Sequence, residues 1–132
     1  MKPLDITREW LDKAEEDYQF ACKNLETSTF YAQICFHYQQ AAEKYLKAII
    51  IAKKLPFRPV HNLIELWKTG ITALEELRQL EDACYYLNPF YIDTRYPVHW
   101  PVKYDSATAL EAKEHVTTIR DLTLQLLKEQ TS

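Results

Sequence analysis

Residues 30–54, FYAQICFHYQQAAEKYLKAIIIAKK, decide the fold of this chain. Apolar residues recur in this stretch every three or four positions, which is the spacing of one face of an α-helix. The stripe consists of Tyr31, Ile34, Cys35, Tyr38, Ala41, Ala42, Tyr45, Leu46 and Ile49. About 24 residues at 1.5 Å each give a helix of roughly 36 Å. We therefore predict a central helix that runs the whole length of a small bundle.

Four further stretches have helical periodicity, and with the central helix they predict an all-α fold. Their limits are residues 6–26, 61–69, 72–87 and 106–128. We expect Gly70 to cap the end of the short helix, and Thr72 with Glu75 to form a capping box for the next helix. The predicted architecture is an antiparallel up-down bundle of four long helices plus one short helix, in a single domain over residues 1–132.

The last helix has a clear start signal and an apolar stripe. Either Asp105 or Ser106 can act as its N-cap. Its buried face is predicted to comprise Leu110, Val116, Ile119, Leu122 and Leu126. The chain also has only one glycine, so it has few residues suited to the tight turns of β-hairpins, which again favours helices.

Composition and charge exclude several classes of protein. The formal net charge is -3, so no global basic field would draw the chain onto nucleic acid or an anionic membrane, and any RNA contact must be local. The longest apolar run, Ala48–Ala52, is too short to span a bilayer, and the charged N-terminus is unlike a signal peptide. Cys22, Cys35 and Cys84 lie in helical patterns, as expected for reduced thiols of a cytoplasmic protein.

Residues 88–104, NPFYIDTRYPVHWPVKY, differ from the rest of the chain. Three prolines forbid a regular helix there, and five aromatic residues make the stretch unusually apolar for a loop. A long loop in a small domain is often functional. The alternative is an ordered cover that packs its aromatic rings over the open end of the bundle.

Histidine is the natural proton carrier at neutral pH, and the chain has four. We interpret His37 and His115 as surface or interhelical hydrogen-bonding residues, and His61 as a residue that caps the third helix or pins the preceding loop. None of them belongs to a zinc-binding HExxH pattern, and no cofactor or metal is expected.

His99 follows Arg95 by four positions, and Asp93 precedes Arg95 by two. An arginine, a histidine and an acidic residue form a usable set for phosphodiester cleavage, because the guanidinium holds the phosphate while the imidazole moves a ribose proton. Arg95 could equally pair with Asp93 or with a carboxylate at a helix end. The candidates for nucleotide or RNA binding in the same stretch are Arg95, Tyr96, Trp100, Lys103 and Tyr104.

Four segments resemble the HEPN family, whose name stands for higher eukaryotes and prokaryotes nucleotide-binding domain. They are WLDKAEEDY at residues 10–18, HYQQAAEKYLKA at 37–48, PVHNL at 59–63 and TRYP at 94–97. They come in the family's order at about its spacing, and the resemblance covers essentially the whole chain. The second segment has two interpretations: Ala41 and Ala42 can allow close helix packing, with Gln40, Glu43 and Lys47 satisfying one another, or the polar residues can bind a ligand directly.

The resemblance implies a helical bundle, commonly a homodimer, that is often encoded beside a minimal nucleotidyltransferase with which it looks like a toxin–antitoxin pair. Many HEPN proteins are metal-independent endoribonucleases that use an arginine followed, after four to six residues, by a histidine. The matching positions here are Arg95 and His99, with only three residues between them. The residue after the arginine is Tyr96, where the family usually has Asn, Asp or His.

These observations lead to three functional hypotheses. The leading one is a dimeric, toxin-like HEPN partner of a minimal nucleotidyltransferase that binds nucleotide or RNA near residues 88–104. The second is an active metal-independent endoribonuclease toxin that uses Arg95 and His99. The third is a non-catalytic helical adaptor without a ligand.

Overall fold

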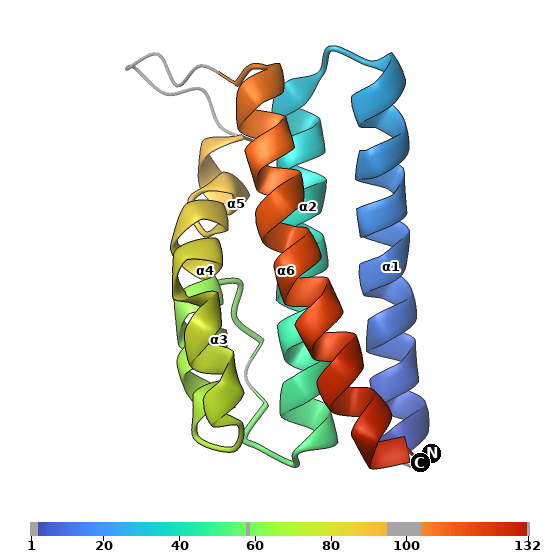
Figure 1. Cartoon of the computed structure of the whole chain (residues 1–132), viewed down its shortest axis with the longest axis vertical. Helices are drawn as coiled ribbons and strands as arrows, with labels where there is room; N and C mark the ends of the chain where they lie inside the picture. Colours follow the sequence, from blue (N-terminus) through green and yellow to red (C-terminus); the bar gives the residue numbers. More distant parts are fainter. Residues whose placement is uncertain (1–2, 58, 95–103, 132) are drawn as a thin grey trace.

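The computed structural model describes residues 3–57, 59–94 and 104–131. In this part of the chain the elements are α1 (Pro3–Thr27), α2 (Tyr31–Ala52), α3 (Leu63–Ile71), the 3₁₀ helix η1 (Glu75–Leu80), α4 (Glu81–Leu87), α5 (Phe90–Asp93) and α6 (Ser106–Thr131). Figure 1 shows α1, α2 and α6 as long neighbouring rods, with α3, α4 and α5 along one side. The predicted all-α bundle is confirmed.

α2 is the central helix, as its pattern predicts. It packs against α1, α3, α4, α5 and α6. Its predicted stripe is buried from Ile34 to Ile49, and Ala41 and Ala42 are completely covered. Because alanine side chains are small, they allow the backbones of neighbouring helices to approach closely. This helps α2 to pack against several helices at once.

The predicted long helix at residues 72–87 is divided into η1 and α4. In a continuous α-helix the Leu77 carbonyl would accept the amide of Glu81, but it accepts the indole N–H of Trp67 at 2.6 Å instead. The Glu81 amide donates instead to the carbonyl of Arg78, the residue after Leu77. The expected buried residues of this stretch, Leu77, Leu80, Ala83, Cys84 and Leu87, are buried as predicted.

Two predictions about the end of α3 are wrong. Gly70 lies inside the helix, which continues to Ile71, and a Cβ at this position would lie 2.7 Å from Cδ1 of Leu77. The glycine therefore permits close packing between α3 and η1. Thr72 is the C-cap of α3, and its hydroxyl donates to the Thr69 carbonyl at 2.6 Å, so it does not form a capping box with Glu75.

α6 begins where the sequence predicts, but the residues on its buried face differ in part from the predicted ones. Asp105 caps the helix, because its Oδ1 accepts the amide and the hydroxyl of Thr108, both at 2.9 Å. Leu110, predicted to be buried, is 52% exposed, and the buried positions in its turn belong to Ala109 and Ala112. Within the described residues no helix combines the length and apolarity needed to cross a membrane.

Candidate functional site

The structure describes only part of the predicted site. Asp93 is the last residue of α5, and Thr94 is its C-cap. Tyr104 lies just before α6, with its ring edge-to-face against Phe90 at 5.7 Å. The predictions for the other site residues remain predictions, because these residues lie outside the described part of the chain: Arg95, Tyr96, His99, Trp100 and Lys103.

The beginning of the 88–104 stretch is a folded stem. Contrary to the expectation of a wholly non-helical loop, residues Phe90–Asp93 form the one-turn helix α5, with Pro89 at the N-cap position, where its missing amide costs nothing. Phe90 is buried, and the Thr94 hydroxyl donates to the Phe90 carbonyl at 2.5 Å. α5 packs against α2. The stem therefore fits the interpretation of an ordered cover.

Two contacts fix this stem to His61, just before α3, and to Leu63, the first residue of α3. The ring of Tyr91 stacks on the imidazole of His61, with centroids 4.3 Å apart and planes inclined by 13°. The side chain of Asn88 accepts the amide of Leu63 at 2.8 Å. These contacts hold α5 against the residues around His61, although His61 and α5 are far apart in the sequence.

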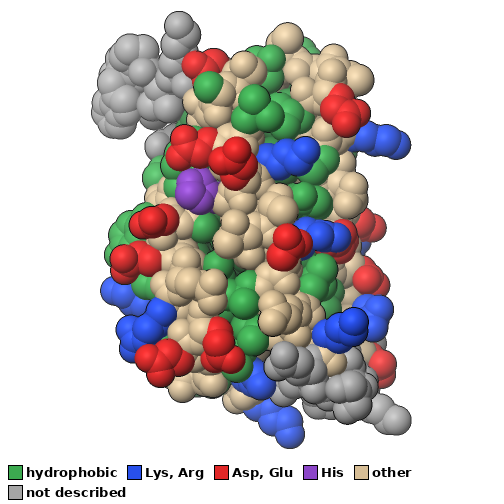
Figure 2. Space-filling view, in the orientation of Figure 1, with side chains coloured by type: hydrophobic (Ala, Val, Ile, Leu, Met, Phe, Trp, Pro, Cys, Tyr) green, Lys and Arg blue, Asp and Glu red, His purple; other side chains and the backbone are tan. Residues whose placement is uncertain are grey.

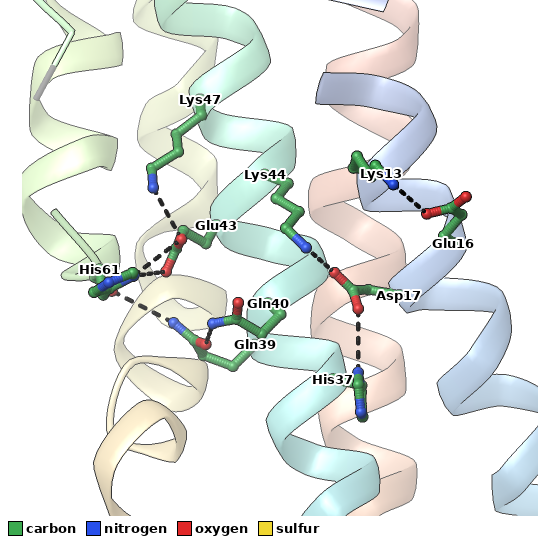
Figure 3. A network of polar contacts seen from close by, with 10 residues as sticks. All are labelled: Lys13, Glu16, Asp17, His37, Gln39, Gln40, Glu43, Lys44, Lys47 and His61. Carbon is green, nitrogen blue, oxygen red and sulfur yellow. Dashed lines mark hydrogen bonds and ion pairs between the residues drawn. The ribbon is translucent and has the colours of Figure 1, made fainter. Parts of the chain in front are cut away.

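His61 in turn contacts an ion pair in the interior. Its Nδ1 lies 3.1 and 3.2 Å from the two carboxylate oxygens of Glu43, and Nζ of Lys47 donates to Oε2 of Glu43 at 2.9 Å (Figure 3). Lys47 also lies over the rings of Trp10 and Phe57, with Nζ 5.4 and 5.9 Å from their centroids. Charges taken out of water need several such partners to offset the loss of hydration. We call Glu43, Lys47, His61 and Tyr91 the Glu43 network.

The segment at residues 37–48 combines packing with this network. Ala41 and Ala42 are buried, as the packing interpretation expects. The Glu43–Lys47 pair was also expected, whereas Gln40 donates to the side chain of Gln39 at 2.8 Å, beside the network in Figure 3. Gln39 itself donates to the carbonyl of His61 at 3.4 Å. The polar side chains of α2 thus hold the loop before α3 in place.

The family assignment follows from a comparison of the whole chain. The family model described as HEPN domain matches residues 7–127, which includes α2, α5 and most of α6. This chain belongs to the HEPN domain family. The resemblance of the four short segments is therefore confirmed.

Two solved structures share the fold of this HEPN chain. TT1696 from Thermus thermophilus is 29% identical, with a TM-score of 0.76, over 90% of this chain and 96% of that protein. ST0689, an archaeal HEPN homologue, is 20% identical, with a TM-score of 0.72, over 91% of this chain and 96% of its own; at this identity the likeness shows the fold alone. No curated protein matches the chain.

A second polar cluster of the HEPN chain joins α1 to α2. Asp17 lies between Lys44, whose Nζ is 2.5 Å from Oδ2, and His37, whose Nδ1 is 3.1 Å from Oδ1 (Figure 3). Burial raises the pKa of Asp17, but the hydrogen bonds and charges of His37 and Lys44 outweigh it and hold the pKa below its usual value. His37 is thus an interhelical hydrogen-bonding residue, as predicted. A pocket of about 300 Å³ opens beside it, rimmed by Phe20 and Phe30.

The sequence contained only a partial signal for the Glu43 network. One interpretation of His61, that it pins the preceding loop, is confirmed, and Asn62 is the residue that caps α3, by accepting the amides of Ile64 and Glu65. The partner of His61 was missed because Glu43 lies 18 positions earlier in another helix. Among the described residues no group of His, Cys, Asp and Glu side chains is arranged to hold a metal ion.

Proposed function

We propose that this HEPN protein is the homodimeric, toxin-like partner of a minimal nucleotidyltransferase, acts in the cytoplasm, and binds a nucleotide or RNA near residues 88–104. Membership of the HEPN family supports the proposal. The single observation that carries it is the stack of Tyr91 on His61. It anchors the helical stem that leads directly into the stretch with Arg95, so a rigid scaffold holds the stem of a candidate binding loop.

The residue types of the stretch suit a phosphate-containing ligand. The guanidinium of Arg95 can donate two parallel hydrogen bonds to a phosphate, and Lys103 adds a second cation. Tyr96 and Trp100 offer aromatic faces on which bases can stack. Because the chain as a whole carries a net charge of -3, binding depends on these local groups rather than on a general attraction.

The proposal is tested by association in solution. The HEPN chain is co-expressed with a minimal nucleotidyltransferase taken from the neighbouring genes, purified through a tag on one partner only, and sized by light scattering. We expect the HEPN chain to be a dimer by itself and to co-purify with the nucleotidyltransferase. A monomeric HEPN chain that forms no complex would contradict the proposal.

A further inference from the structure

A pocket of about 300 Å³ lies where the end of α1 meets the start of α2. None of the residues that line it belongs to the 88–104 stretch, so the proposed function does not use it. Sites for small molecules are mostly apolar cavities of about this size or larger, with a few polar groups that orient the ligand. This pocket has that composition, and its polar groups indicate the class of ligand.

Two phenylalanine rings from different elements form apolar walls of the pocket. Phe20 lies on α1 and is 50% exposed, and Phe30, the N-cap residue of α2, is 71% exposed. Ile34, on the first turn of α2, also lines the pocket and is buried. A flat aromatic ligand in the pocket would remove part of both rings from water, and aromatic rings pack favourably on one another.

His37 supplies a hydrogen-bond acceptor to the pocket. Its Nδ1 lies 3.1 Å from Oδ1 of Asp17, whose other carboxylate oxygen pairs with Nζ of Lys44. An ionised carboxylate can only accept, so Nδ1 of His37 carries the hydrogen, and in the neutral ring Nε2 has a lone pair. In Figure 3 the ring of His37 extends from Asp17 towards the start of α2, which is where the pocket lies.

The other polar groups of the pocket are uncharged. Asn24 donates its Nδ2 to the carbonyl of Phe20 at 2.8 Å, which leaves its Oδ1 as a second acceptor. Ser28 accepts the amide of Phe30 through Oγ at 3.0 Å and keeps its hydroxyl hydrogen. Among the described residues that line the pocket, none is Lys, Arg, Asp or Glu. A charged ligand would therefore lose hydration without gaining a charged partner there, so the pocket favours a neutral ligand.

We propose that this pocket binds a small neutral phenol, with its ring against Phe20 and Phe30 and its hydroxyl group donating to Nε2 of His37. A phenol combines a flat apolar ring with one O–H donor, which matches the two rings and the imidazole acceptor. A ligand without a donor would leave Nε2 of His37 unpaired. Asp17 does not touch the ligand in this arrangement; it positions the ring of His37 and fixes its tautomer.

The experiment titrates the full chain with p-cresol and follows the backbone amide signals by ¹H–¹⁵N NMR. The matched ligand is 4-methylanisole, which has the same ring and methyl group but an ether in place of the hydroxyl, so it cannot donate. A third ligand, N-acetyl-tyrosinamide, represents the other occupant that this chemistry allows, the tyrosine side chain of a partner protein.

Two variants test the two parts of the pocket, and each has a matched control. His37→Phe keeps a ring but removes the acceptor; its control is His115→Phe, because His115 also contacts a carboxylate and an aromatic ring. Phe30→Ala removes an exposed wall; its control is Tyr85→Ala, which removes an aromatic ring that is 54% exposed on α4. Circular dichroism establishes that each variant is folded.

We expect p-cresol to bind at one site with a Kd on the order of 0.1–1 mM and to shift the amide signals of residues 20–37. The affinity for 4-methylanisole should be about tenfold lower, because the acceptor of His37 stays unpaired. In His37→Phe this difference between the two ligands should disappear. Phe30→Ala should weaken both ligands about three- to tenfold, and both control variants should behave as the wild type.

Three results would overturn the inference: no saturable shift at residues 20–37 up to about 10 mM p-cresol, equal affinity of the wild type for the two matched ligands, and a preference for p-cresol that persists in His37→Phe. Binding of N-acetyl-tyrosinamide more than about tenfold tighter than p-cresol would also overturn it, in favour of a partner's tyrosine. If His37→Phe does not fold, the two ligands and Phe30→Ala decide the matter. RNA takes no part in this test, so the proposed function stands or fails separately.

Discussion

At the scale of single residues, the Glu43–Lys47 ion pair places two charged groups in the core, where they lose contact with water. Both side chains are nearly inaccessible, at 3% and 6% exposure, and lie on consecutive turns of α2. The pair costs hydration energy that its hydrogen bonds must offset. His61 contacts the carboxylate of Glu43, and the ammonium of Lys47 lies over the rings of Trp10 and Phe57. These contacts offset part of the lost hydration.

Removal of one partner should therefore be strongly destabilising. We expect Lys47→Met to lower the free energy of unfolding by about 3–5 kcal/mol, because Glu43 would keep a buried charge without its ammonium partner. The control is Lys13→Met, which breaks the exposed Lys13–Glu16 pair and should cost about 1 kcal/mol or less. Urea denaturation measures both. Equal losses in the two variants would show that the buried pair has no special energetic role.

The sequence could predict a role for His61 but not its partner. The position after Pro59 and before an apolar helical pattern limits His61 to a cap or a loop anchor. Helical periodicity tells which face of α2 is buried, but not which polar side chain from a distant segment reaches that face. The contact with Glu43 depends on the path of the loop between α2 and α3, which no local pattern specifies.

At the scale of elements, one ion pair ties three helices together. Arg120 on α6 donates to both carboxylate oxygens of Glu15 on α1, at 2.5 and 3.3 Å, and Tyr45 on α2 donates to the same carboxylate at 2.5 Å. Burial raises the pKa of Glu15, but the hydrogen bonds from Arg120 and Tyr45 outweigh burial and lower the pKa below its ordinary value of 4.5. The ionised form of Glu15 is therefore the form that joins α1, α2 and α6.

The lowered pKa of Glu15 predicts that the folded chain loses stability as the pH falls. The unfolded chain takes up the Glu15 proton at a higher pH than the folded chain, so the contribution of Glu15 is complete above pH 4.5 and is lost as the pH falls through the lower folded value. We expect Glu15→Gln to be about 1.5–3 kcal/mol less stable than the wild type at about pH 6, and the difference to shrink towards about pH 3. Urea denaturation at both pH values measures it.

Glu16→Gln is the control, since Glu16 is exposed and pairs only with Lys13 among the ion pairs of the described chain. It should leave stability nearly unchanged at both pH values. A difference between Glu15→Gln and the wild type that stays constant with pH would contradict the role of the Glu15 carboxylate. Asp17, whose pKa is also lowered, should keep part of the acid dependence in the Glu15 variant.

The elements show where sequence patterns succeed and where they fail. The long helices α1 and α2 follow their apolar periodicity closely, and α6 follows it except at Leu110, because burial of one face dominates the energetics of these helices. The split between η1 and α4 depends on the indole of Trp67, which takes the carbonyl of Leu77 from the helix. Such a tertiary hydrogen bond leaves no trace in the local pattern, so a continuous helix was the natural prediction.

At the scale of the whole molecule, the net charge of -3 gives no general attraction to nucleic acid. Figure 2 shows acidic and basic side chains interspersed over one face, with apolar side chains between them. This agrees with the net charge of -3 and confines the proposed binding to local groups. Partners are harder to predict than the fold, because exposed apolar residues such as Phe30 and Ile92, at 71% and 58% exposure, do not specify the surface that would cover them.

The location of the proposed site was available from the sequence, because prolines and aromatic residues set the 88–104 stretch apart from the helices around it. The structure adds the stem, with Tyr91 on His61 and Asn88 on Leu63. The sequence did not show that this stem is connected to a buried charge pair, since the connection joins three segments that are separate in the chain.

The central claim is that the 88–104 stretch binds the ligand, and RNA binding by Arg95→Ala tests it most directly. Fluorescence anisotropy with a short single-stranded oligoribonucleotide compares the wild type, Arg95→Ala and the charge-matched control Arg8→Ala, in which an exposed arginine near the start of α1 is removed, far from α5 in Figure 1. We predict that Arg95→Ala weakens binding about tenfold or more, as on loss of a charged hydrogen bond, and that Arg8→Ala binds as the wild type. Equal affinity of Arg95→Ala and the wild type would contradict the claim.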